Sequence, residues 1–488
     1  MTLHPSTDRW AMAIAISTAT GAWLGTTPPR WLPPQALTLA VLSGVGLTLT
    51  ALAATRGGRA RWWVGVGLCV CFGLAGVAGV LGQRAVAGLV PPGEGRVRAE
   101  MTLVSDPAPL PRGGVRAEAR YRGKRVALIA FSSAAAALDD RLAGEIVVVD
   151  GTVGPPGTFE RRLRHRHLAG RLEVDFVMGW RPGHGVFDAA NDVRRALERG
   201  AESLRPRERS LFLGLVIGDD RFQPADLTLA FREAGLSHMT AVSGQNVAFV
   251  LAAAAPVLRR LRLAPRLLLT LGLLAAFALV TRGEPSVLRA TGMAAVAAYG
   301  AAVGRPTSGL RALATAITAL VLCDPLLVTS LGFRLSVAGA AGILVAARPI
   351  ERVLPGPGWL RSPLGVTLAA QLAVAPLLIS AFGSVAVASV LTNLLAAPAA
   401  GPVMAWGLVA GLLAGLLGGR AAVLLHLPTR ALLAWIERVA VAGARWPLGR
   451  IGGRELGIVA VFAVVALLVR RFGSRRREIS PDVAPAGP

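Results

Sequence analysis

Apolar residues in this chain gather in long runs, separated by short polar loops. A helix crosses a bilayer with roughly 20 apolar residues, so runs of this kind predict about 11–12 transmembrane helices. Pro376, Pro398 and Pro402 could break helices or make re-entrant pieces, which leaves the count open by one or two. The predicted spans are Trp10–Leu24, Ala36–Ala54, Trp62–Leu81, Thr240–Leu258, Leu267–Val280, Ser286–Val303, Leu313–Leu331, Leu335–Ala347, Leu364–Phe382, Val385–Ala400, Val403–Leu417 and Ile458–Val469.

One long polar stretch, residues 84–209, follows the third span. Its first part alternates apolar and polar residues in short segments that are separated by clusters of Gly and Pro. Such segments predict β-strands, at 97–104, 115–121, 125–131 and 145–149. Strands of this length and number suit a five-stranded OB-like barrel, a fold that often binds single-stranded nucleic acid.

Two segments have the pattern of helices that lie on a membrane surface. Residues 189–209 place Val193, Leu197 and Leu204 on one face, with arginines elsewhere. Pro428–Ala444 has a similar apolar stripe. Both predict interfacial helices.

Arginines in short loops set the orientation, because such loops stay in the cytoplasm. They occur after the second span, after the fourth span and after the last one, so both termini are expected in the cytoplasm and residues 84–209 outside it. The chain is thus expected in a bacterial cytoplasmic membrane. The arginines are Arg56, Arg59, Arg61, Arg259, Arg260, Arg262, Arg266, Arg470, Arg471 and Arg475–Arg477.

Composition supports the membrane assignment and excludes some enzymes. Of 488 residues 53% are hydrophobic, the mean hydropathy is +0.56, and the formal net charge is +24. Lys124 is the lone lysine, and Arg125 follows it, so no P-loop for ATP is present. Many arginines are accounted for by the cytoplasmic loops, so the net charge is not by itself a signal for DNA binding.

Cysteines and histidines give no metal or redox site. Cys69, Cys71 and Cys323 lie within apolar runs, which argues against a disulfide framework. His165 and His167 resemble a fragment of a hydrolase metal motif, but no Asp-His pair follows. We therefore expect no metal, no cofactor and no catalytic residue.

The most informative stretch is residues 213–250. Ser237 and His238, then Ser243 to Asn246, lead directly into an apolar span. Polar side chains are costly when they face lipid, so these are expected to face a bundle interior, a cavity or another helix. Hydrogen bonding between helices with helix capping is one interpretation, and a gate or substrate contact beside a pore is the other.

Here the sequence resembles the ComEC-type competence protein family of bacterial DNA-uptake channels. Five motifs occur in the family's order, across residues 10–470. They are Ile217-Gly218-Asp219 with Ala234–His238 and Ala241–Val247; Glu284–Ala290; Asp324-Pro325 with Leu331–Ala338; Gln371 with Pro376-Leu377, Phe382-Gly383 and Asn393–Pro398; and, in the outer segment, Pro156–Leu163.

The resemblance implies a channel that conducts single-stranded DNA across the cytoplasmic membrane during natural transformation. It also implies an extracytoplasmic DNA receptor as a partner. Many family members carry a C-terminal metallo-β-lactamase-like domain, whose His-x-His-x-Asp-His motif is missing from this sequence, so we expect a separate nuclease. Since the chain has no ATP site, a cytosolic helicase, ATPase or strand-binding protein is expected to drive uptake, with proton coupling as the alternative.

These expectations divide the chain into N-terminal spans 1–83, an extracytoplasmic OB-like domain 84–188, an interfacial helix 189–209, a competence-type channel domain 210–472 and a disordered cytoplasmic tail 473–488.

Candidate residues follow from the chemistry of DNA, whose phosphates need cations or hydrogen-bond donors and whose bases stack on aromatic rings. A solvated loop or a lipid-headgroup contact would explain the outer basic cluster equally well. The outer-domain candidates are Arg161, Arg162, Arg164, Arg166 and Arg171, with Tyr121 and Phe159 as stacking rings. The path or gate candidates are Asp219, Ser237, His238, Ser243, Gln245, Asn246, Glu284, Arg289, Asp324, Arg334, Gln371 and Asn393.

Arg289 and Arg334 are the notable cations within the bundle. An arginine at the centre of a membrane costs roughly 2.5–3.5 kcal/mol, so each is expected to be paired or to face a cavity. Glu284 lies five residues before Arg289, and an ion pair between them is one interpretation. Phosphate contact by Arg289 or Arg334 is the functional one.

Two other functions stay open. An intramembrane serine hydrolase would use Ser243 with His426 as the distant histidine. A small-solute permease would explain the broken spans, but it gives no reason for the outer domain.

Overall fold

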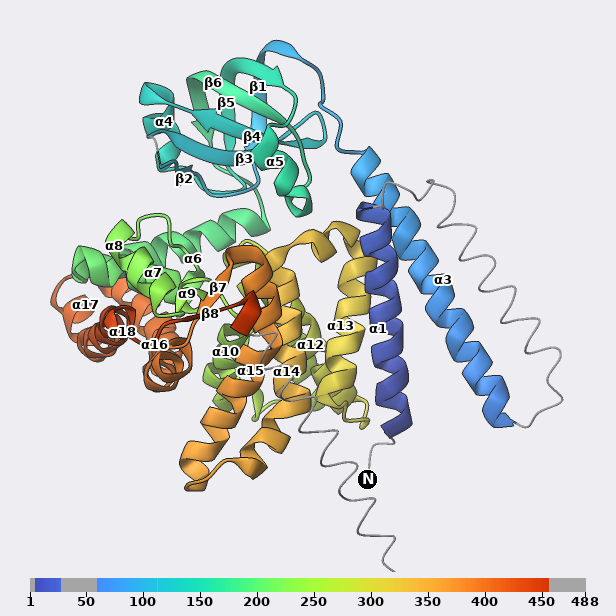
Figure 1. Cartoon of the computed structure of the whole chain (residues 1–488). Coiled ribbons are helices and arrows are strands. Elements are labelled where there is room, and N and C mark those ends of the chain that lie inside the picture. Colours follow the sequence, from blue (N-terminus) through green and yellow to red (C-terminus); the bar gives the residue numbers. More distant parts are fainter. Residues whose placement is uncertain (1–4, 28–58, 112, 456–488) are drawn as a thin grey trace, which may run out of the picture.

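The computed structural model describes residues 5–27, 59–111 and 113–455. A barrel of strands stands at one end of a helical bundle (Figure 1). The predicted spans Ala36–Ala54 and Ile458–Val469 and the tail 473–488 lie outside the described residues.

The barrel is closed by five strands. Neighbours run in the order β1-β5-β6-β4-β3, and β3 pairs back onto β1. All of these pairs are antiparallel except β4 with β6, which is parallel. The strands are β1 Gly95–Leu103, β3 Val115–Tyr121, β4 Lys124–Ala130, β5 Ile146–Gly154 and β6 Leu168–Arg181, with a short β2 Ala108–Pro109 beside β3.

The alternation in the sequence matches the barrel walls. In β1 the side chains of Met101 and Leu103 are buried and Thr102 between them is exposed. Helix α4 (Ser132–Asp139) adds Ala134, Ala135 and Leu138 to the same core. Strand β6 was not among the predicted strands, because its second half exposes Phe176, Met178 and Trp180 and thus carries apolar residues on the outer face.

Helices α1 (Pro5–Thr26) and α3 (Arg59–Ala87) run in the same direction and touch closely. Gly21 lies against the backbone of Ala75, and Gly25 against that of Gly79, so that a Cβ at either glycine would overlap a carbonyl oxygen. Small residues four apart permit this approach of two membrane helices. The first and third predicted spans are therefore packed as a pair.

The rest of the membrane bundle follows the predicted spans in order. Its helices are α10 Gly244–Leu258, α11 Leu263–Val280, α12 Pro285–Ala302, α13 Gly309–Cys323, α14 Leu331–Val353 and α15 Gly358–Phe382, with a 3₁₀ turn, η3 Pro325–Thr329, between α13 and α14. Five described helices are long and apolar enough to cross a bilayer: Val64–Ala87 of α3, and α11, α14, α15 and α16.

One continuous helix, α16 (Ser389–Leu417), replaces the two spans predicted at Val385–Ala400 and Val403–Leu417. Pro398 and Pro402 both lie inside it and do not break it, so the prediction of two separate spans here was wrong. A proline in a membrane helix is tolerated when neighbouring helices compensate for the lost backbone bond. The interior of α16 is surrounded by helices, since Ala396, Ala399, Ala400 and Val403 are buried.

The segment predicted as one surface helix, 189–209, forms three pieces. They are α6 Val186–Gly200, the 3₁₀ turn η2 Ala201–Ser203 and α7 Pro206–Ile217, where Pro206 occupies the first helical position. The apolar face of α6 packs on α16, where Ala196 and Gly200 touch the backbone of Gly415 and Gly411. The apolar face of α6 is therefore covered by α16 and does not contact lipid, as a helix lying on the membrane surface would. The location of this segment at the membrane interface stays a prediction.

A second group of helices surrounds α16. It consists of α6, α7, α8 (Ala225–Glu233), α9 (Ser237–Thr240), α17 (Gly419–Leu425) and α18 (Leu427–Arg445), which gather to one side of the bundle (Figure 1). Phe212 and Phe231 are fully enclosed in its core. A short sheet of β7 (Ser384–Ala386) and β8 (Arg450–Gly452) follows α15 and α18.

Candidate functional site

The barrel is joined to the helices by a cluster of buried charges, which we call the junction cluster: Asp106, Arg194, Asp219, Arg221 and Arg282. Asp106 lies in the barrel loop after β1, and its carboxylate meets Arg282 at 2.7 Å and Arg194 at 3.0 Å. Arg194 comes from α6 and Arg282 from the loop between α11 and α12. The cluster thus ties one barrel loop to two separate parts of the bundle.

Asp219 completes the junction cluster from the loop after α7. Its Oδ2 accepts hydrogen bonds from Arg194 at 2.9 Å and from Arg221 at 2.6 Å. Gly218 ends α7 in the left-handed conformation (φ 71°), which turns the chain so that Asp219 points into the cluster. Asp219 was predicted on a DNA path, but its side chain is 1% exposed and neutralised by two arginines. These ion pairs hold the cluster together, and a place for Asp219 on a DNA path stays a prediction.

The two carboxyl groups of the junction cluster are held ionised. Burial alone would raise the pKa of Asp106, but the guanidiniums of Arg194 and Arg282 outweigh it and lower that pKa to about 2. Burial is likewise outweighed at Asp219, whose pKa is lowered by Arg221 and Arg194. At neutral pH the cluster therefore carries three positive and two negative charges.

A second contact between barrel and bundle uses the outer basic cluster. The segment 158–167 forms helix α5 (Thr158–Arg162) and the 3₁₀ turn η1 (Arg164–Arg166). His167 Nε2 lies 2.9 Å from Asp324 Oδ2 at the end of α13, and Arg164 donates to the carbonyl of Thr26 at the end of α1 at 2.9 Å. Asp324, predicted on the DNA path, thus holds the barrel.

Of the five candidate arginines of the outer domain, two have no hydrogen-bond or ion-pair partner among the described residues. Arg161 and Arg162 are exposed, whereas Arg166 pairs with Glu118 and Arg171 with Glu173, both at 2.9 Å. A carboxylate or carbonyl therefore already occupies Arg164, Arg166 and Arg171.

The two predicted stacking rings differ. Tyr121 is 7% exposed and belongs to the barrel core, so its prediction as a stacking platform was wrong. Phe159 is 58% exposed and has the guanidinium of Arg116 at 4.5 Å from its ring centre. An exposed ring beside an arginine is an arrangement that stacks bases.

The stretch around Ser243 folds as the start of α10. Ser243 donates from its hydroxyl to Asn246 Oδ1 at 3.1 Å, and Asn246 Nδ2 donates to the carbonyl of Leu215 in α7 at 3.0 Å. Gln245 is exposed. Asn246 thus makes an interhelical bond, as in the first interpretation from sequence, whereas the Ser243 side chain bonds within its own helix start and does not cap it.

Arg289 reaches this helix start from the second turn of α12. Its side chain packs so close to Gly244 that a Cβ there would overlap Nη2. Its Nε donates to Ser336 Oγ of α14 at 2.8 Å, and its Nη1 contacts Met293 Sδ at 3.0 Å. Within residues 5–27, 59–111 and 113–455, no carboxylate lies within 4 Å of this buried guanidinium. The ion pair with Glu284 suggested by the sequence does not form.

Glu284 forms no ion pair in the described part of the chain. Burial of its carboxyl raises its pKa, with the carboxylates of Asp220 and Glu118 adding to the rise and Arg166 opposing it. Arg334, in the first turn of α14, is exposed and without an ion pair in the part of the chain that the structure describes.

The remaining candidates lie on α9, α15 and α16. Ser237 and His238 of α9 are exposed, and Asn393 of α16 donates from Nδ2 to the carbonyl of Ser389 at 2.7 Å. Gln371 is half-buried in the middle of α15. The structure brings Ser243, Asn246 and Arg289 together, and it does not bring Gln371 into that group by any contact.

Comparison with known proteins assigns the helical part. A family model described as "Competence protein" matches residues 215–475, which is more than half of the chain. The chain belongs to the competence protein family.

Other comparisons cover less. A competence-family relative, ComE operon protein 3 of Bacillus subtilis (strain 168), is 27% identical over 289 residues. That match covers 58% of this chain and 37% of the relative, so the chain spans well under half of the relative in the match. No solved structure matches. Together with its apolar helices, membership of the family identifies a multi-pass membrane protein.

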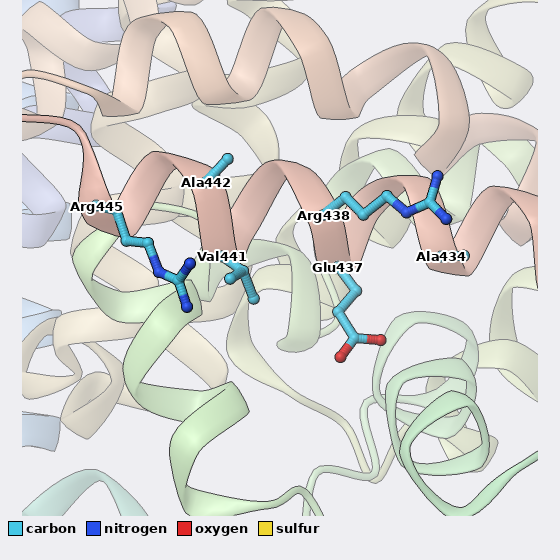
Figure 2. A pocket seen from close by; sticks show the side chains of 6 residues that line it. All are labelled: Ala434, Glu437, Arg438, Val441, Ala442 and Arg445. Carbon is cyan, nitrogen blue, oxygen red and sulfur yellow. The ribbon is translucent and has the colours of Figure 1, made fainter.

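A hollow on α18 lies apart from these residues. Figure 2 shows it lined by Ala434, Glu437, Arg438, Val441, Ala442 and Arg445, all on one helix. Glu437 also pairs with Arg207 of α7 at 2.9 Å. The hollow includes none of the candidate residues.

Among the described residues, no group of three or more His, Cys, Asp or Glu is arranged to hold a metal ion.

The serine hydrolase alternative would need a Ser–His pair. The Ser243 hydroxyl bonds to Asn246, and His426 lies buried between α17 and α18 with its ring edge-on to Phe212, 5.2 Å between centres. No contact joins the two residues among those described.

Several important residues were not found from the sequence. Asp106, Arg194, Arg221 and Arg282 look like ordinary polar residues of loops or of an exposed helix face, and only the fold brings them together. The sequence offered one weak signal, the position of Arg282 just before the Glu284-Pro285 motif. In the structure Arg282 lies in a turn and has a φ of 59°. Ser336 lay inside a quoted motif but had no assigned role.

Proposed function

We propose that this competence-family protein conducts single-stranded DNA across the cytoplasmic membrane during natural transformation. The observation that carries the proposal is a pair of unneutralised arginines at the end of the bundle that adjoins the barrel: Arg289 in the second turn of α12 and Arg334 in the first turn of α14. Arg166 and Arg282 nearby pair with carboxylates, whereas Arg289 and Arg334 have no carboxylate within 4 Å in the described part of the chain and are therefore free to meet phosphates.

The barrel is proposed to be of OB type and to guide the strand. Its strand order, its parallel β4–β6 pair and the helix between β4 and β5 support that assignment. Arg161, Arg162 and Phe159 are exposed on it and are the outer-domain residues that we propose to contact DNA. Ser237, His238, Gln245, Glu284, Gln371 and Asn393 are kept as proposed path residues.

The energy for uptake is proposed to come from another protein. Moving each phosphate inward against an inside-negative potential costs about 2.3 kcal/mol per 100 mV. The sequence has no P-loop, so a cytosolic helicase, ATPase or strand-binding protein is the proposed partner, with an extracytoplasmic DNA receptor and a separate nuclease on the other side. Both termini are proposed to be cytoplasmic.

The test is transformation of a deletion strain that is complemented with variants. Arg289→Gln and Arg334→Gln are expected to lower transformation at least tenfold while still reaching the membrane. Arg352→Gln, at the opposite end of α14, is the matched control and should transform as the wild type does. Normal transformation by the deletion strain itself would refute the proposed function.

A further inference from the structure

The start of α10 is a helix N-terminus without a cap. The Ser243 hydroxyl donates to Asn246 and accepts no hydrogen bond from a helix amide. In the described structure, no group accepts from the backbone amides of Gly244 and Gln245. Free amides and the helix dipole make such an end attractive to anions.

Arg289 brings a buried cation to the same point. The residue is 8% exposed, its Nη2 lies against Gly244, and no acceptor for Nη2 occurs among the described residues. Ser336 fixes the guanidinium through Nε, which leaves Nη2 directed at the helix start. Glu284, the carboxylate closest in sequence, forms no ion pair with this guanidinium, which contacts Ser336 and Met293.

The Arg289 guanidinium and the positive N-terminal end of α10 repel each other unless an anion lies between them or beside them. A buried guanidinium is costly without a counterion, and the positive end of a helix makes its position less favourable still. Nothing in the described part of the chain supplies the negative charge. The local structure is therefore complete only with a bound anion.

We propose that Arg289 and the first-turn amides of α10 form a binding site for one phosphate group. The inference rests on the proposed function, in which that group belongs to the backbone of the transported strand. Gly244 is required because any Cβ would displace Nη2, and arginine is required because its planar fork binds Ser336 and a phosphate at once. Ser336 is a positioning residue.

The test uses the purified full-length protein in detergent with inorganic phosphate as the probe, at constant ionic strength set with chloride. Binding is followed by the rise in thermal unfolding temperature, and a short single-stranded oligothymidylate competes in a second titration. Arg289→Gln and Gly244→Ala should each weaken phosphate binding at least tenfold. Arg352→Gln should bind as the wild type does.

Gly244→Ala keeps every charge, so it carries the test if Arg289→Gln fails to fold. Phosphate binding by both variants that equals wild-type binding would overturn the site. Failure of the oligonucleotide to compete would overturn the assignment of the phosphate to DNA. A deletion strain that transforms normally, with phosphate binding still lost in the two variants, would refute the proposed channel and leave the anion site standing.

Discussion

Replacing Asp106 with Asn should loosen the barrel from the bundle. Asp106 is the one barrel side chain in the junction cluster, and the substitution leaves Arg194 and Arg282 buried without their shared carboxylate. Removing one member of a buried ion pair typically costs about 3–5 kcal/mol. At 1.36 kcal/mol per factor of ten, even the lower figure corresponds to a change of more than a hundredfold in the opening equilibrium.

Hydrogen–deuterium exchange at the junction measures this opening. The amide of Gly144 donates to the carbonyl of Leu103 at 2.7 Å, beside Asp106 but not to it, so its exchange reports loosening and not the loss of its own partner. The variant should exchange at this amide about a hundredfold faster. Asp150→Asn is the control, because the Asp150–Arg96 pair is exposed and such pairs contribute about 0–1 kcal/mol.

Lowering the pH should weaken the junction cluster by protonating Asp106. Asp106 has its pKa lowered from 3.8 to about 2, so its contribution is complete above its unfolded pKa and is lost as the pH falls from about 4 to about 2. The difference of about 2 units corresponds to about 2.5 kcal/mol. If Gly144 exchange in Asp106→Asn stays within threefold of wild type, or if Asp150→Asn accelerates it equally, the reasoning about the junction cluster is refuted.

Three further outcomes are expected. Gly25→Val should separate α1 from α3 and destabilise the protein by about 1–3 kcal/mol in thermal unfolding, whereas Gly73→Val, which has open space, should not; equal effects would contradict the close packing. Asn246→Ala should cost about 1–3 kcal/mol because it leaves the buried carbonyl of Leu215 without its donor, and an unchanged melting temperature would argue against that bond. A double-mutant cycle of His167→Ala with Asp324→Asn should give a coupling of about 1 kcal/mol or more for the second barrel contact, and additive effects would show that the pair contributes nothing.

Much of the architecture was predictable because it depends on local patterns. Apolar runs predicted the bundle helices in order, and alternation predicted four of the barrel strands, since both signals arise from one face or one segment contacting lipid or core. Strand β6 was not predicted, because Phe176, Met178 and Trp180 make its outer face apolar. The continuity of α16 through Pro398 and Pro402 was not predicted either, because it depends on neighbouring helices that compensate for the missing backbone bonds.

The candidate site divides in the same way. By itself the sequence determined the membrane class, the inserted barrel and the importance of the stretch from Ser243 to Asn246. It could do so because the free-energy cost of placing polar side chains in lipid restricts where they occur. Only the tertiary structure decided which charges are neutralised. Asp219 and Asp324, equal to Arg289 as candidates in the sequence, are joined to residues distant in the chain, whereas Arg289 is left beside Gly244 without a carboxylate among the described residues. Charge pairing depends on contacts between distant segments, and those contacts exist only in the fold.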